Sequence, residues 1–152
     1  MKECAADLLD MLAEHELLLE KLYEVYAEKL PSWSDFWNEL AAEESEHEQM
    51  IRSLALKVEQ GSIACQPGRF SEEVLKNSLD YVRGELARAR ALPIELIEAL
   101  STARDLEDSL IERHFFDVFD DDSKEMTETL RLLGARTSAH RARALEAWSS
   151  QH

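Results

Sequence analysis

A carboxylate and an imidazole stand three residues apart in the stretch AAEESEHEQM, at Glu44 and His47. Residues three apart on a helix lie on one face, with their Cβ atoms about 5–6 Å apart, so both side chains can reach a single ion. Carboxylate oxygens and neutral imidazole nitrogens are natural ligands of transition metals. On a solvent-facing helix the same pair would carry no functional meaning, so its interpretation depends on which face it occupies.

The apolar residues around Glu44 and His47 predict that this pair faces the core. Successive helical residues turn by about 100°, so positions three, four and seven apart share a face. The apolar positions on the face of Glu44 and His47 are Trp33, Trp37, Leu40, Ile51, Leu54 and Val58. This stripe is therefore apolar at both ends and polar in the middle.

Three other stretches show the same interruption. Glu16 interrupts a stripe of leucines and tyrosines between residues 9 and 30, and Glu107 interrupts a stripe between residues 96 and 118. Thr137 and His140 interrupt a fourth stripe between residues 126 and 148. Glu16 is followed after 28 and 31 residues by Glu44 and His47, and Glu107 is followed after 30 and 33 residues by Thr137 and His140. These similar spacings indicate an internal repeat, with its polar groups meeting in one layer.

Several buried carboxylates need compensation, because each ionised carboxylate that is buried without a partner costs several kcal/mol. A bound metal ion supplies that compensation. We therefore expect a metal site formed by Glu16, Glu44, His47, Glu107 and His140. The alternative is a set of buried polar side chains that satisfy one another through hydrogen bonds.

Three neighbouring residues are expected to have other roles. His15 lies off the apolar stripe of its helix and is expected to face solvent. Tyr23 is expected to be a core aromatic residue. His114 occupies the position in the second half that matches Tyr23, so we expect it to form a hydrogen bond across the core.

Helices must position all of these residues, and no strand pattern appears. Breakers and capping residues predict helices over about 5–29, 34–60, 71–92, 94–119 and 123–149, with Gly61 ending the second. Short loops make antiparallel hairpins of the first two and of the last two helices. About thirty residues, including the extra helix at 71–92, connect the two hairpins. One long crossover between two hairpins predicts an all-α, ferritin-like four-helix bundle.

Composition and charge narrow the class of protein. A chain of 152 residues is expected to form a single domain over 1–152. A net charge of −15 argues against binding to nucleic acid or to anionic membranes, which would repel it. Cys4 and Cys65 form no C-x-x-C pair and are expected to be reduced thiols. With no apolar leader and no run of 18 apolar residues, a cytoplasmic location is expected.

One short motif resembles a known family. The stretch LAAEESEH has the pattern L-A-x-E-E-x-x-H, and an inward Glu16 is followed by Y-x-x-Y-A at Tyr23. Together these features resemble the rubrerythrin-like branch of the ferritin-like superfamily. By that resemblance Glu16, Glu44, His47, Glu107 and His140 match the positions of di-iron ligands, and the implied activity is reduction of O₂ or peroxide, or oxidation of Fe(II).

Two features depart from the family pattern. The family pattern calls for a second Glu-x-x-His in the last helix, but this chain has TSAH, with Thr137 in place of the glutamate. The chain also has no C-terminal rubredoxin-like cysteine cluster, through which rubrerythrins receive electrons. With one carboxylate missing, three arrangements are open: a mononuclear site, a weak second site, or a site in which water and His114 fill the place of the glutamate.

Three hypotheses of function follow from the sequence. The first is a non-haem carboxylate metalloprotein, with iron in a dinuclear or mononuclear site and manganese or zinc as alternatives, acting on O₂, peroxide or Fe(II). The second is a catalytically inactive ferritin-like module that binds one metal ion or none and serves in metal binding or interaction. The third is a metal-free bundle. A homodimer is expected in each case, because two-fold dimers are the commonest oligomers.

Overall fold

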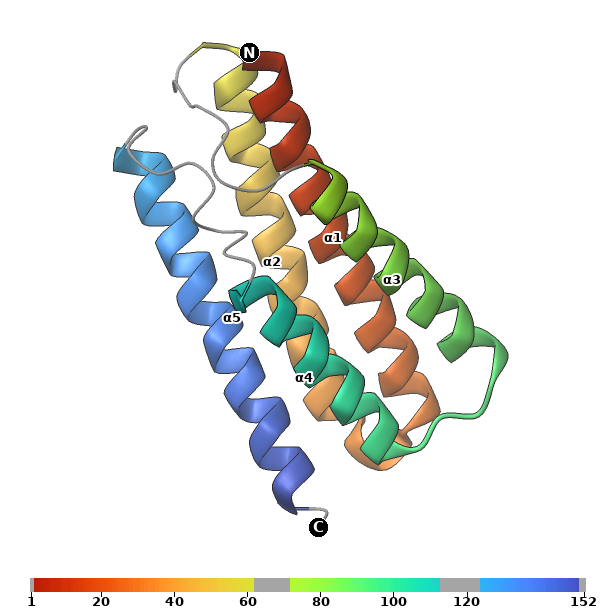
Figure 1. The fold of residues 1–152 in the computed structure, drawn as a ribbon. Coiled ribbons are helices and arrows are strands. Elements are labelled where there is room, and N and C mark those ends of the chain that lie inside the picture. Colours follow the sequence, from red (N-terminus) through yellow and green to blue (C-terminus); the bar gives the residue numbers. More distant parts are fainter. Residues whose placement is uncertain (1, 62–71, 113–123, 151–152) are drawn as a thin grey trace.

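A computed structural model describes residues 2–61, 72–112 and 124–150 of the chain (Figure 1). Within these ranges the chain is helical and contains no strand, which confirms the all-α prediction there. The helices are α1 (Lys2–Lys29), a short 3-10 helix η1 (Pro31–Trp33), α2 (Ser34–Glu59), α3 (Glu72–Ala91), α4 (Leu96–Glu112) and α5 (Lys124–Ser150). His114 and the predicted end of the fourth helix at 119 lie outside the described residues.

Proline and glycine set several helix boundaries. Leu30 precedes Pro31 and leaves the helical region, with φ −122° and ψ 71°, because the proline ring disfavours helical backbone at the residue before it. Gly61 follows α2 with φ 77°, a conformation that costs glycine little, so its predicted role at the end of this helix is confirmed. α4 begins at Leu96 rather than at 94, because the carbonyl of Glu95 accepts the first helical hydrogen bond, from the Ala99 amide.

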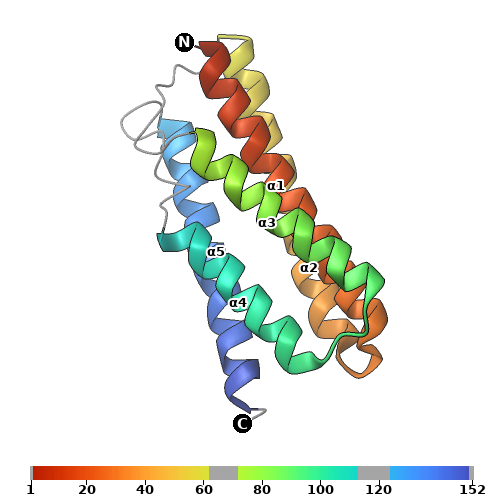
Figure 2. The ribbon, with the colours of Figure 1, turned by 45° about the vertical axis from the view of Figure 1, so that its right-hand side comes forward.

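The helices pack as two pairs with one additional helix. α1 and α2 run antiparallel and pack along their length, and α4 and α5 form a second antiparallel pair (Figure 1). α1 lies between α2 and α3, as the rotated view in Figure 2 also shows. α2 contacts α5, and this contact joins the two pairs. The polar residues selected from the sequence therefore come from helices that face one another.

An apolar core holds these helices together. Its largest fully buried side chains are aromatic: Trp37 lies 4.9 Å from Tyr26 and 5.6 Å from Tyr23, measured between ring centroids. Such aromatic contacts contribute about 0.5–1.5 kcal/mol each beyond the area they bury. This aromatic group lies at the turn between α1 and α2, where it fixes the two helices on one side of the buried polar residues.

Lys29 fixes the end of α3 against the end of α1. Its ammonium group donates hydrogen bonds to the carbonyl oxygens of Ala89, of Arg90 at 3.2 Å and of Leu92 at 2.7 Å. The last carbonyls of a helix have no partner within the helix, so a lysine from another helix can satisfy them.

Among the described helices, none combines the length and the apolarity that a membrane span requires.

Candidate metal centre

Polar side chains from four helices meet in the interior of the fold. Each has at most 1% of its surface exposed: Glu16 from α1, Glu44 and His47 from α2, Glu107 from α4 and His140 from α5. They form two groups of three that share Glu44. Within each group, one ligand atom from every residue lies within 4.8 Å of the others. The structure thus buries all five residues selected from the sequence and brings them together.

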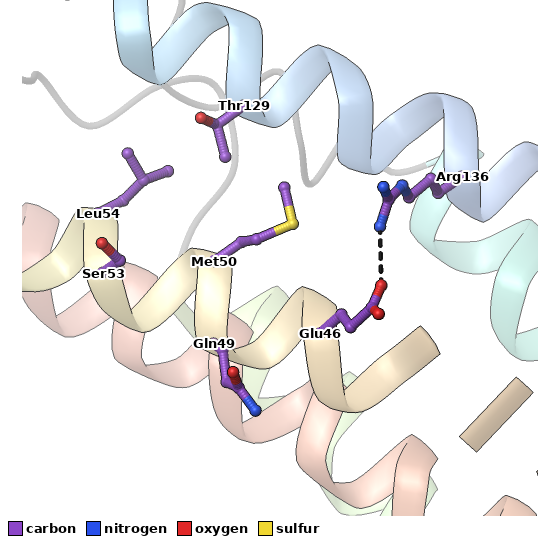
Figure 3. Close-up of a pocket in the computed structure, with 7 residues that line it drawn as sticks. All are labelled: Glu46, Gln49, Met50, Ser53, Leu54, Thr129 and Arg136. Atoms are coloured by element: carbon purple, nitrogen blue, oxygen red, sulfur yellow. Dashed lines mark hydrogen bonds and ion pairs between the residues drawn. The ribbon is translucent and has the colours of Figure 1, made fainter. Parts of the chain in front are cut away.

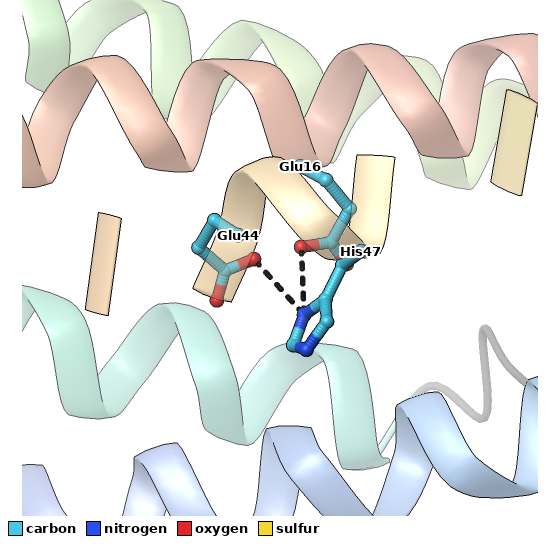
Figure 4. A group of neighbouring side chains, drawn as sticks. All are labelled: Glu16, Glu44 and His47. Carbon is cyan, nitrogen blue, oxygen red and sulfur yellow. Dashed lines mark ion pairs between the residues drawn. The ribbon is translucent and has the colours of Figure 1, made fainter. Parts of the chain in front are cut away.

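The first group joins α1 to α2 (Figure 4). His47 Nδ1 lies 3.8 Å from Glu16 Oε2 and 3.5 Å from Glu44 Oε2. Two ligands that each lie about 2.1 Å from one ion are about 3.0 Å apart at right angles and about 4.2 Å apart when opposite. The spacing of these three side chains therefore matches the spacing of ligands around one ion.

The second group joins α2, α4 and α5. His140 Nδ1 lies 2.7 Å from Glu44 Oε1 and 3.4 Å from Glu107 Oε1. Tyr23 on α1 donates a 2.8 Å hydrogen bond to Glu107 Oε1. Tyr23 is therefore a buried aromatic residue, as expected from the sequence, but its hydroxyl also orients one of the carboxylates of the cluster.

Glu44 connects the two groups. One of its oxygens faces His140 and the other faces His47, so the carboxylate lies between the two imidazoles. The rings of His47 and His140 are stacked, with centroids 5.4 Å apart and planes inclined by 23°. Glu44 could therefore supply one oxygen to each group.

Several buried ligand atoms in the cluster have no hydrogen-bond partner among the residues that the structure describes. They are both oxygens of Glu16, Oε2 of Glu44, Oε2 of Glu107 and both ring nitrogens of His47. An unpaired buried polar atom costs about 1–3 kcal/mol, and a charged one costs more. Carboxylate oxygens and imidazole nitrogens are the ligand atoms that transition-metal ions bind in proteins. These buried atoms without hydrogen-bond partners therefore fit such an ion.

Burial and mutual charge shift the protonation of this cluster. Burial, reinforced by the nearby Glu44 carboxylate, raises the pKa of Glu16 to about 8. Burial alone would lower the pKa of His47, but the carboxylates of Glu16 and Glu44 outweigh it and raise the pKa to about 9. Glu107 and Glu44 likewise outweigh the burial of His140 and raise its pKa to about 11. Without metal, the cluster therefore holds protons in the places where a cation would bind.

Thr137 is buried on α5, one turn before His140, with 1% of its surface exposed. The internal repeat predicts an inward-facing residue at this position, and the burial of Thr137 agrees with that prediction. Threonine offers one neutral hydroxyl where glutamate would offer two anionic oxygens. The group around Glu107 and His140 therefore has one carboxylate fewer than the repeat and the family pattern call for.

The expected exposure of His15 was wrong. This residue is fully buried, and its Nε2 atom lies 2.8 Å from Ser78 Oγ on α3. Burial lowers the pKa of His15 to about 4, against the opposing effect of Glu16. α3 covers a second face of α1. The buried residues Leu8, Leu18 and Leu22 are spaced so that they share a helix face with position 15, and this spacing could have predicted the burial of His15.

Glu43 is a residue of the site that sequence reasoning missed. It lies off the apolar stripe of α2, yet its Oε1 atom lies 3.0 Å from Nε2 of His140. The two residues are 97 positions apart, and no local pattern predicts their contact. Only the packing of α5 against α2 brings them together.

A pocket of about 510 Å³ lies beside this cluster, between α2 and α5 (Figure 3). Met50 and Leu54 line it from α2, and Thr129 lines it from α5. An ion pair of 3.2 Å between Arg136 and Glu46 crosses one end of it. None of the five candidate ligands lines this pocket, so it is separate from the cluster.

Comparison of the chain with protein-family models, with curated proteins and with solved structures gave no match.

Proposed function

We propose that the buried cluster is a dinuclear transition-metal site of the carboxylate and histidine type, with iron as its metal. The position of Glu44 carries this proposal. Its two oxygens face two separate groups of ligands, and each group contains one further carboxylate and one imidazole. A core held only by hydrogen bonds would not leave so many buried oxygen and nitrogen atoms without a hydrogen-bond partner in the described part of the chain.

Each residue has a role in this proposal. Glu16 and His47 would hold one ion, and Glu107 and His140 would hold the other, with Glu44 between the two groups. The carboxylates neutralise the charge of the ions, while Tyr23 keeps Glu107 oriented through its 2.8 Å hydrogen bond. Full burial excludes bulk water from the ligands, which strengthens their attraction for cations. Bound iron would supply the redox chemistry that reduces O₂ or peroxide, or Fe(II) would be the substrate that is oxidised.

We also propose that α1, α2, α4 and α5 form a ferritin-like four-helix bundle, with α3 in the crossover. The two antiparallel pairs and the placement of one inward glutamate on α1 and another on α4 support this fold. In ferritin-like di-iron proteins, two helices each give a glutamate and the other two each give a Glu-x-x-His. Glu44 and His47 fit the second pattern, and Thr137 breaks it in α5. The resemblance to rubrerythrins rests on the same residues.

A second function is favoured by one observation, the buried Thr137. With three carboxylates in the cluster, two divalent ions are less well compensated than with four. A ferritin-like module that binds one ion in the group of Glu16, Glu44 and His47, without catalysis, is therefore the competing proposal.

Metal titration distinguishes these proposals. Apo-protein is titrated with Co(II), whose absorbance reports coordination, and iron content is measured for protein purified from iron-supplemented cells. Wild type is compared with Glu44→Gln and with Glu46→Gln, a variant of an exposed glutamate on the same helix that lies outside the cluster. We expect about two ions per chain in wild type, loss of binding to both groups in Glu44→Gln, and no change in Glu46→Gln.

The outcomes are distinct. Two ions per chain, together with Fe(II) oxidation under O₂ or peroxide, support the oxidoreductase. One ion per chain without oxidation supports the module. No uptake of Co(II) or iron by wild-type protein overturns the metal centre altogether.

A further inference from the structure

His140 has different partners on its two ring nitrogens. Nδ1 faces the cluster, 2.7 Å from Glu44 Oε1 and 3.4 Å from Glu107 Oε1. Nε2 faces the opposite way and lies 3.0 Å from Glu43 Oε1. His140 is 1% exposed, whereas the side chain of Glu43 is 28% exposed, so Glu43 approaches the imidazole from the outer edge of the cluster.

We propose that Glu43 is a positioning residue for the metal centre: it fixes the ring of His140 and holds a proton on Nε2, so that Nδ1, between Glu44 and Glu107, is the nitrogen left to bind the metal. This inference rests on the proposed metal site, and it gives a role to a residue outside the ligand set. Glu43 touches only the far side of the imidazole and binds no metal itself.

The tautomer argument follows from the chemistry of the two groups. A neutral imidazole carries a proton on one nitrogen and a lone pair on the other, and a metal binds the lone pair. A carboxylate only accepts hydrogen bonds, so Glu43 requires the proton on Nε2. In the metal-free protein Glu44, at 2.7 Å, accepts a proton from Nδ1 in the same way. A metal displaces that proton, so the lone pair it meets is that of Nδ1, the nitrogen that faces the other ligands. Carboxylates that accept the second N–H of a metal-binding histidine also make the imidazole a stronger ligand.

Glu43 is itself held in place from α5. The Nη2 atom of Arg143 lies 2.8 Å from one oxygen of Glu43 and 3.0 Å from the other, and Nη1 lies 3.1 Å from Glu39. These bonds from Arg143 orient the carboxylate of Glu43 in the absence of any metal.

The chain offers a matched control for this arrangement. Glu46 also lies on α2 and also pairs with an arginine of α5, at 3.2 Å from Arg136, but it forms no ion pair with a histidine among the described residues. Its side chain is 65% exposed. Glu43→Ala and Glu46→Ala each remove an ion pair with an arginine of α5, and only the first removes an acceptor from His140. A loss of equal size in both variants would come from the ion pairs alone.

The test measures affinity and tautomer separately. Co(II) affinity is measured on wild type, Glu43→Ala, Glu43→Gln and Glu46→Ala. We expect Glu43→Ala to lose about 10- to 100-fold in affinity, the usual range for such partners. Glu43→Gln should lose less than Glu43→Ala, because its amide oxygen can accept the same N–H, and Glu46→Ala should match wild type.

Nitrogen NMR of protein with ¹⁵N-labelled histidine supplies the second readout. The His140 signals are assigned by their loss in His140→Gln. In Zn(II)-loaded wild type we expect a protonated Nε2 and an unprotonated Nδ1, and in Glu43→Ala we expect the Nε2 proton to exchange rapidly with water. The same protection of the Nε2 proton is expected in wild-type apo-protein, so this arm does not require metal.

Equal Co(II) affinity of Glu43→Ala and wild type, or an equal loss in Glu46→Ala, would overturn the inference. Unchanged protection of the His140 Nε2 proton in Glu43→Ala apo-protein would overturn it as well. Failure of wild type to bind Co(II) contradicts the proposed function instead, and the apo-protein measurement then still decides whether Glu43 fixes His140.

Discussion

Protons and metal ions compete for the same atoms in this cluster. The carboxylate of Glu16 and the imidazole of His47 are fully buried, and their pKa values are raised, which favours the protonated form of each side chain. A cation that binds between them must displace those protons, because metal ligands are deprotonated. A single buried residue can therefore have opposite effects on stability in the apo-protein and in the metal-loaded protein.

Thr137→Glu tests the missing carboxylate. If the group around Glu107 and His140 binds metal, the added carboxylate should tighten that group and raise the number of Co(II) ions bound per chain. If the core is free of metal, the same change buries an unpaired charge and should lower the free energy of unfolding by about 3 kcal/mol or more. Titration with Co(II) and thermal melting of wild type and variant measure both effects. A lowered melting temperature with no gain in stoichiometry or affinity argues against a damaged dinuclear site.

Tyr23→Phe tests the orientation of Glu107. The substitution removes the hydroxyl that donates to Glu107 Oε1 and keeps the aromatic ring, so packing changes little. Hydrogen bonds to charged groups contribute about 1.5–3 kcal/mol. We therefore expect the free energy of unfolding of the apo-protein, measured in urea, to fall by about 2 kcal/mol.

Tyr81→Phe is the control for this measurement, because Tyr81 is 47% exposed and lies outside the cluster. Surface substitutions usually change stability by less than about 0.5 kcal/mol. Equal stability of the Tyr23→Phe and Tyr81→Phe variants would show that the bond to Glu107 contributes nothing.

At the scale of the elements, α1 is buried on two faces. One face carries Glu16 and Tyr23 toward α2 and α4, and the other carries His15 toward Ser78 on α3. α3 contributes none of the five candidate ligands, and it is attached to α1 through apolar contacts, the His15–Ser78 bond and Lys29 at its C-terminal end. We therefore expect that a substitution which destabilises α3 leaves the metal affinity of the cluster unchanged.

Ser78→Ala tests this separation. It leaves the buried His15 Nε2 without its 2.8 Å partner, so we expect a loss of about 1–2 kcal/mol in the free energy of unfolding and faster amide exchange in α3. Co(II) affinity should not change. Ser53→Ala, which removes an exposed hydroxyl on α2, serves as the control. A large drop in Co(II) affinity in Ser78→Ala would mean that α3 takes part in holding the cluster.

At the scale of the whole molecule, buried and part-buried polar contacts connect the two helix pairs. Glu44 and Glu43 of α2 contact His140 of α5, and Tyr23 of α1 contacts Glu107 of α4. Exposed ion pairs such as Arg136–Glu46 contribute little to the free energy of unfolding, because solvent screens them. A metal in the cluster would therefore link α1 and α2 to α4 and α5.

The pH dependence of apo-protein stability follows from the raised pKa values. The folded protein holds protons on Glu16 up to about pH 8, on His47 up to about pH 9 and on His140 up to about pH 11, whereas the ordinary pKa values are 4.5, 6.5 and 6.5. Between its ordinary and its raised pKa, each group binds more protons in the folded protein than in the unfolded chain. Stability therefore falls as pH rises from about 6.5 to 9, by about 1.4 kcal/mol per pH unit for each such proton. His15 acts in the opposite sense, because its lowered pKa removes stability only as pH falls from 6.5 toward 4.

Thermal melting of chelator-treated protein between pH 6.5 and 9 checks whether the stability of the apo-protein falls as pH rises. The stabilisation by bound metal should change with pH in the opposite direction. Ligands deprotonate more easily at higher pH, so the increase in melting temperature caused by saturating Zn(II) should grow from pH 6.5 to 8. Apo-protein whose melting temperature rises over this interval would contradict the protonation of Glu16 and His47 described above.

The sequence by itself determined the helices and the five inward polar residues. Helix ends and helical periodicity are local properties of the sequence. Pro31 and Gly61 end helices where expected. Because one buried face of a helix repeats every three or four residues, the apolar stripes also selected the buried polar residues Glu16, Glu44, His47, Glu107 and His140. The same local information predicted that Thr137 faces inward.

Tertiary structure alone decided which residues touch across helices. His15 was misjudged because one stripe was taken as the only buried face of α1, whereas α3 covers another. The contact between Glu43 and His140 spans 97 residues and depends on how α5 packs against α2. Helical periodicity assigns each side chain to a face of its own helix, but the distance and rotation between two helices come from the packing of all the side chains between them.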